Sequence, residues 1–95
     1  MYTCVKTIVA NKDISPRVAM NFVANLVKVK SSVYFALKDR EINAKSVLGI
    51  ISINIKNGDE FTITTRSVIS QLDAENDINQ VVEFLNGISQ KSHWL

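Results

Sequence analysis

Two serines have the positions that most favour chemistry, because each stands directly before a segment with the pattern of a helix. Ser15 precedes Pro16, the only proline of the chain, and Ser46 precedes an apolar run over residues 47–53. Serine is a favoured N-cap residue and stabilises a helix by about 1 kcal/mol. The N-terminus of a helix also presents unpaired amides and the positive end of the macrodipole, which suit an anion. The residues leave two interpretations open, plain caps or positions that handle phosphate.

The charge of the chain is unevenly distributed, and the basic half contains both serines. Residues 1–48 carry eight Lys or Arg against three Asp or Glu, whereas residues 49–95 carry three against six. Arg17 lies in the first turn of the helix that Ser15 would cap. From charge alone, solvated faces of ordinary helices and strands are the simpler explanation of this distribution. A formal net charge of +2, with basic residues not interleaved with aromatic ones, argues against nucleic-acid binding.

Most familiar kinds of active site are excluded by composition. His93 is the only histidine and Cys4 the only cysteine, so neither a metal cluster nor a Ser-His-Asp triad can be built in the body of the fold. No phosphate-binding glycine loop occurs, and we expect no enzyme activity and no cofactor. The apolar runs are far too short to span a bilayer, and neither a leader segment nor paired cysteines are present. We therefore expect a cytoplasmic protein without a membrane partner.

The periodicity of apolar residues predicts the elements that position these serines. Alternation indicates strands, and apolar residues three and four apart, such as Phe22 and Leu26, indicate helices. Acidic residues favour a last helix that starts near Asp73, and Gly87 is a natural residue to end it. The expected strands cover 2–10, 32–38, 41–44 and 60–66, and the expected helices 16–28, 47–53 and 73–86. The order β-α-β-β-α-β-α predicts an α+β two-layer sandwich, with helices on one face of an antiparallel sheet.

Two runs of residues resemble a known family. ISPRVA at 14–19 resembles the active-site segment of HPr, the histidine-containing phosphocarrier of the bacterial sugar phosphotransferase system, and NAKSVLGIIS at 43–52 resembles the regulatory-serine segment of its Gram-positive members. The similarity covers roughly residues 6–88, with a few extra residues after Arg66. It implies the HPr-like open-faced sandwich with a four-stranded antiparallel sheet. We expect one HPr-like domain over residues 1–88 and a short tail over residues 89–95.

The chain departs from the family at one position that matters for chemistry. Ser15 stands where the family has the histidine that accepts a phosphoryl group. A phosphoserine ester is stable and does not readily pass its phosphoryl group on, and serine is a weak nucleophile without a base, for which Asp13 is the one candidate. The chain is therefore most similar to the catabolite-repression HPr-like proteins that lack the histidine, which implies a non-catalytic regulatory protein.

The resemblance also implies a site and partners. Ser46 would be phosphorylated by HPr kinase/phosphorylase, and the phosphoprotein would bind a LacI-type repressor such as catabolite control protein A. Arg17 and Lys45 would bind the phosphate. Three apolar side chains would contact the partner, unless they are ordinary core residues: Val47, Leu48 and Ile51.

Two further readings remain open. The chain is alternatively a phosphocarrier component with a shifted acceptor, Ser15 or His93, which Enzyme I would load and permease components would unload. In the other reading it is a scaffold that binds a protein without any phosphate, through residues 47–53.

Overall fold

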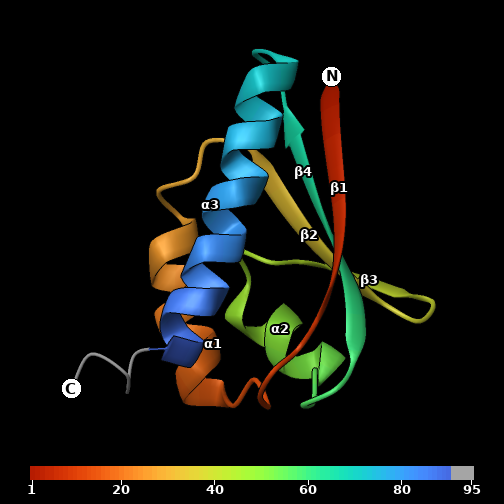
Figure 1. The fold of residues 1–95 in the computed structure, drawn as a ribbon, viewed down its shortest axis with the longest axis vertical. Coiled ribbons are helices and arrows are strands. Elements are labelled where there is room, and N and C mark those ends of the chain that lie inside the picture. Colours follow the sequence, from red (N-terminus) through yellow and green to blue (C-terminus); the bar gives the residue numbers. More distant parts are fainter. Residues whose placement is uncertain (91–95) are drawn as a thin grey trace.

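The structure, a computed structural model, describes residues 1–90, so His93 and the other residues of 91–95 lie outside the described part. Its seven elements follow the predicted order (Figure 1). The elements are β1 (Tyr2–Val9), α1 (Pro16–Leu26), β2 (Ser32–Leu37), β3 (Arg40–Asn43), α2 (Val47–Ile53), β4 (Glu60–Ser67) and α3 (Gln71–Gln90).

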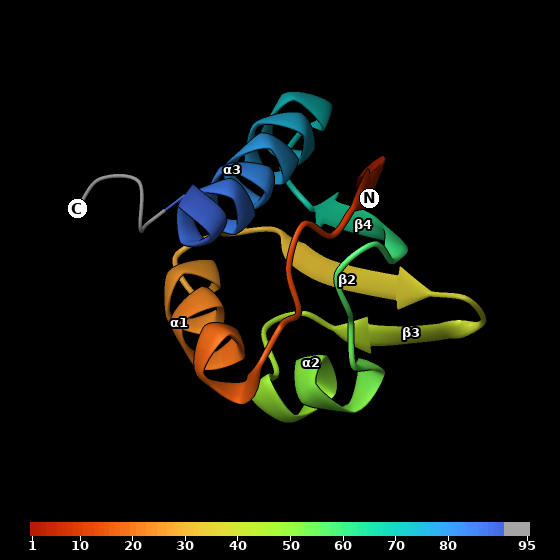
Figure 2. The ribbon, with the colours of Figure 1, turned by 60° about the horizontal axis from the view of Figure 1, so that its bottom comes forward.

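The strands form one four-stranded sheet in the order β1-β4-β2-β3, and every neighbouring pair is antiparallel. The three helices lie on one face of this sheet, and Figure 2 shows α1 and α2 next to each other. This arrangement confirms the predicted α+β open-faced sandwich. The edge strands are β1 and β3, and β4 and β2 lie between them. The pairings of β4 with β1 and with β2 are longer than the pairing of β2 with β3, and α3 packs against β1 and β4.

The core lies between the sheet and the helices and is built around aromatic rings. Phe35 of β2 lies 5.5 Å from Phe22 of α1 and 5.1 Å from Phe61 of β4, centroid to centroid. Alternate residues of β4 point inward, as their period of two predicts, and the last helix is fixed to them where the buried Thr65 hydroxyl donates to the carbonyl of Ala74 at 2.7 Å. No buried side-chain nitrogen or oxygen in the described residues lacks a hydrogen-bond partner.

Several predicted boundaries are wrong by a few residues. Helix α1 ends at Leu26 instead of Lys28, because the chain tightens there into a turn in which the N–H of Lys28 donates to Asn25 O. Strand β3 covers 40–43 instead of 41–44, since Lys38, with φ of 58°, places the turn earlier. The strand predicted over 41–44 therefore begins and ends one residue earlier.

The last helix differs most from its prediction. It begins at Gln71 instead of near Asp73, because the Ser70 hydroxyl accepts the N–H of Asp73 and caps the first turn. It also continues through Gly87 to Gln90, so the prediction that Gly87 ends it is wrong. No helix within residues 1–90 has both the length and the hydropathy to cross a bilayer.

Candidate functional site

Ser15 caps α1 as its sequence context predicts. Its backbone is extended (φ −73°, ψ 166°), and its Oγ accepts the N–H of Val18 at 3.3 Å while Pro16 occupies the first helical position. Ser15 and Arg17 are both exposed, so the first turn of α1 is open to solvent. The opposite side of the helix is anchored by Ala19, Phe22, Val23 and Leu26, all buried.

Asp13, the one candidate base for Ser15, is engaged elsewhere. Its carboxylate accepts the N–H of Asn57 at 2.8 Å, and the neighbouring Ile14 N–H donates to Ile55 O at 3.0 Å. These bonds join the loop that precedes α1 to the loop that follows α2. Asp13 therefore positions the Ser15 loop, and its hydrogen bond does not activate the Ser15 hydroxyl.

Ser46 caps α2 in a less exposed setting. Its Oγ accepts the N–H of Gly49 at 3.1 Å, its carbonyl accepts the N–H of Ile50 at 3.0 Å, and its own N–H donates to Asn43 O at 3.0 Å. A Cβ on Gly49 would lie 3.1 Å from Asn43 O and 3.3 Å from the Ser46 Cβ. Glycine therefore allows the cap to close tightly around the half-exposed Ser46.

The apolar side chains of α2 divide between core and surface. Ile50 and Ile53 are buried, and Val47 is half-buried against the core. Leu48 exposes 78% of its surface and Ile51 exposes 36%. Of the three predicted contact residues, Leu48 and Ile51 are therefore available to a partner, whereas Val47 belongs largely to the fold.

The two cations predicted to bind phosphate lie in different settings. The Lys45 ammonium donates to the carbonyl of Val29 at 2.6 Å, just after the end of α1, and so joins the start of α2 to the α1–β2 loop. The structure therefore places the Lys45 side chain on a backbone carbonyl and not on the Ser46 hydroxyl. Arg17 projects into solvent from the first turn of α1.

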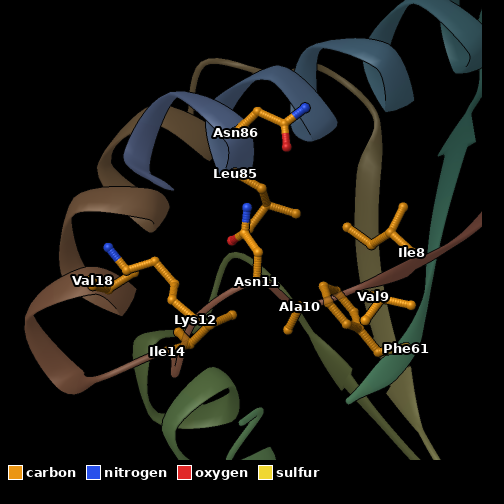
Figure 3. Close-up of a pocket in the computed structure, with 10 residues that line it drawn as sticks. All are labelled: Ile8, Val9, Ala10, Asn11, Lys12, Ile14, Val18, Phe61, Leu85 and Asn86. Atoms are coloured by element: carbon orange, nitrogen blue, oxygen red, sulfur yellow. The ribbon is translucent and has the colours of Figure 1, made fainter. Parts of the chain in front are cut away.

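A small cavity lies behind the Ser15 loop, between the end of β1 and the C-terminal half of α3 (Figure 3). Its volume is about 40 Å³, which suits water but is far below the roughly 300–1,000 Å³ of small-molecule sites. Residues distant in sequence line it, so no local pattern predicts it. The lining residues are Ile8, Val9, Ala10, Asn11, Lys12, Ile14, Val18, Phe61, Leu85 and Asn86.

Other chemistry is limited in the part of the chain that the structure covers. Residues 1–90 contain no group of three His, Cys, Asp or Glu side chains that could hold a metal ion.

Sequence analysis missed the contact that Arg40 makes. Its guanidinium donates to the carbonyl of Ser52 at 2.8 Å and to the Ser52 hydroxyl at 3.3 Å. This contact joins a strand to the end of a helix twelve residues later, and the periodicity of the sequence does not predict such a contact.

Comparison with known proteins finds the same fold. The family model described as the PTS HPr component phosphorylation site matches residues 3–86. A search of curated proteins finds no match. Among solved structures, the phosphocarrier protein HPr from Bacillus anthracis str. Ames is 26% identical, with 86% of this chain and 95% of that chain covered and a TM-score of 0.74.

Two more distant structures share the fold. The histidine-containing phosphocarrier protein of Mycoplasma is 19% identical over 95% of this chain and 93% of its own, with a TM-score of 0.66. Crh, the catabolite repression containing protein of Bacillus subtilis, is 21% identical over 80% of this chain and 83% of its own, with a TM-score of 0.67. The Crh structure is described as an intertwined dimer with a swapped domain.

Proposed function

Because the chain belongs to the HPr family, the phosphocarriers of the phosphotransferase system, we propose that it is a non-catalytic regulatory member, phosphorylated on Ser46. The kinase in this proposal is HPr kinase/phosphorylase. The phosphoprotein then acts as corepressor or effector in catabolite control, on a LacI-type repressor such as catabolite control protein A. A role with these partners is a cytoplasmic one, so the proposal includes a cytoplasmic location.

The observation that carries the proposal is the exposure of Leu48, 78%, two residues after the half-exposed Ser46. An isolated leucine on a surface needs no explanation, but Ile51 lies one turn away on the same short helix and is also exposed. A large aliphatic side chain beside a modifiable hydroxyl provides an apolar anchor next to a switchable charge. Ser15 has no comparable neighbour in its first turn, where Arg17 is exposed.

A phosphate on Ser46 suits the local electrostatics. Neither α1 nor α2 has an acidic side chain in its first turn, so no carboxylate of those turns would repel the phosphate. The Ser46 Oγ already lies at the amide end of α2, where the helix dipole stabilises negative charge. The phosphate would add about −1.5 to −2 charges and three acceptor oxygens, which an arginine or lysine of the partner can bind.

Ser15 at the family's phosphohistidine position supports a regulatory role over a carrier role. An exposed serine whose Oγ caps a helix, and whose nearest candidate base is bonded to Asn57, lacks the activation that a serine nucleophile needs. Fold-level likeness to Crh, a catabolite repression protein, is consistent with the same role.

The test is intact-mass spectrometry with site mapping after two separate incubations, one with HPr kinase/phosphorylase and ATP and one with Enzyme I and phosphoenolpyruvate. We expect one phosphate, on Ser46, from the kinase alone. Ser46→Ala should abolish it, whereas Ser52→Ala, which removes the exposed hydroxyl at the other end of α2, should leave it unchanged.

Full phosphorylation of the Ser46→Ala variant would contradict the proposal. Phosphate transferred from Enzyme I would instead favour the carrier role, with acid-stable phosphate indicating Ser15 and acid-labile phosphate indicating His93. Repressor binding that is indifferent to Ser46→Ala would favour a scaffold that works without phosphate.

A further inference from the structure

A second concavity lies at the end of α2 opposite to Ser46. It is formed by the β2–β3 turn (residues 37–40), the last turn and cap of α2 (residues 52–54), Lys56 and Asp59. We call it the α2 C-terminal cavity. Its volume is about 500 Å³, within the range of small-molecule sites and far larger than the cavity behind Ser15. Figure 2 shows α2 next to β3, the second strand of the β2–β3 hairpin.

Three of the residues that line this cavity are cationic: Lys38, Arg40 and Lys56. They come from two segments that are separated in sequence by α2, so folding alone brings them together. Two carboxylates, Asp39 and Asp59, belong to the same lining, so three positive and two negative charges leave it with a net charge of +1. Asp59 accepts the backbone N–H of Lys56 at 2.9 Å through its Oδ2, which fixes that carboxylate within its own loop. Within the described residues, no side chain or carbonyl accepts a hydrogen bond from the ammonium groups of Lys38 and Lys56.

The groups around the cavity are held in place by hydrogen bonds. Arg40 is fixed by its two bonds to Ser52, whose hydroxyl donates in turn to Gly49 O at 2.8 Å. Asp59 N–H donates to Lys56 O at 2.9 Å, which closes the loop that carries Lys56. Asn54 adopts a left-handed conformation (φ 57°, ψ 59°) at the end of α2. A preformed wall loses little conformational freedom when a ligand binds.

We infer that the α2 C-terminal cavity binds a small organic polyanion, of the class of phosphorylated or polycarboxylate metabolites. Guanidinium and ammonium groups are the donors that proteins use for phosphate and carboxylate oxygens. Ser52 and Asn54 are among the lining residues, and the amide of Asn54 is a neutral hydrogen-bonding group. Asp39, another lining residue, suits a hydroxyl of the ligand, since an ionised carboxylate accepts hydrogen bonds. The inference is independent of phosphorylation at Ser46.

The test is an NMR titration of the ¹⁵N-labelled full chain with pyrophosphate, and separately with citrate, at constant ionic strength. We expect saturable shifts of the backbone amides of Arg40, Asn54 and Lys56. The double variant Lys38→Gln, Lys56→Gln removes two charges and no hydrogen bond within the described residues, so it should fold normally. Its dissociation constant should rise at least about tenfold, because each lost charge-assisted contact weakens binding.

The matched control is Lys28→Gln, Lys30→Gln, which removes the same charge from two exposed lysines of the α1–β2 loop outside the cavity. This control should bind as the unmodified chain does. Stronger binding of pyrophosphate than of citrate would identify phosphate as the preferred group, and the reverse would identify carboxylate. Chemical shifts that do not saturate would overturn the inference. A rise of the dissociation constant in the control equal to that in the double variant would overturn it as well. Binding of an acidic peptide without binding of either small anion would overturn it too.

Discussion

Helices α1 and α2 begin alike, with a serine whose Oγ accepts the N–H of the third helical residue, at 3.3 Å for Ser15 and 3.1 Å for Ser46. The helices then differ. The 11 residues of α1 bury four side chains in the core and expose Met20, five residues after the cap, whereas the 7 residues of α2 bury two and expose Leu48, two residues after the cap. A serine cap by itself therefore does not identify a functional residue. The surface beside the cap distinguishes a helix that holds the fold together from one that can bind a partner.

The largest expected effect concerns the aromatic anchor of α1 in the core. Phe22→Ala removes a fully buried ring that lies against Phe35, and should cost about 3–5 kcal/mol of unfolding free energy. Ile50→Val trims one methylene from the buried side of α2 and should cost about 0.5–1.5 kcal/mol. Urea denaturation with linear extrapolation measures both. A loss below about 2 kcal/mol in Phe22→Ala would show that the Phe22 ring does not anchor α1 in the core.

The next effect concerns binding and rests on the proposed function. Leu48→Asp should weaken binding of the phosphorylated protein to catabolite control protein A at least about 30-fold, since truncating a hot-spot anchor costs about 2 kcal/mol or more. Met20→Asp is the matched control, because Met20 is a large apolar side chain of α1 with 61% exposure. Isothermal titration calorimetry measures both affinities.

Both variants should unfold at nearly the same urea concentration as the unmodified chain, because each change is on the surface. If Met20→Asp weakened repressor binding as much as Leu48→Asp, the contact surface would include α1 and would not centre on α2.

Much of this contrast was predictable from the sequence because it depends on local chemistry. Ser15 before Pro16 and Ser46 before an apolar run are cap signals within one helical turn, and both caps are confirmed. The alternation in β4 likewise predicted its buried face. Errors occurred where tertiary contacts or an unrecognised cap decided the outcome. Ser70 starts α3 early, and the helix continues through Gly87 despite the poor helix propensity of glycine.

The site was only partly predictable, because long side chains choose partners that sequence spacing does not reveal. Lys45 is adjacent to Ser46, yet its ammonium reaches Val29 O. Arg40 lies on β3, yet its guanidinium donates to the carbonyl of Ser52 near the C-terminal end of α2. Val47, Leu48 and Ile51 formed one predicted contact set, and only burial in the folded chain separates Val47 from the other two.

A smaller effect tests how tightly the Ser46 cap is built. Gly49→Ala adds a Cβ at 3.1 Å from Asn43 O, an oxygen that is held in place by the Ser46 N–H. Alanine normally stabilises a helix by about 1 kcal/mol relative to glycine. We expect the crowding to outweigh that gain and to give a net loss of about 1 kcal/mol in a urea melt. A stabilised Gly49→Ala protein would show that the cap of α2 can relax.

The smallest effect tests whether Ser15 is a cap and nothing more. Ser15→Ala should cost about 0.5–1 kcal/mol, because it removes the acceptor for the Val18 N–H in a solvent-exposed turn. Ser15→Asp should recover that loss, since aspartate caps a helix as well as serine and places negative charge at the positive end of α1. For a chain of this size the difference corresponds to about 2–8 °C in melting temperature, which differential scanning calorimetry resolves. If the aspartate variant melted no higher than the alanine variant, the hydroxyl of Ser15 would need a role other than capping.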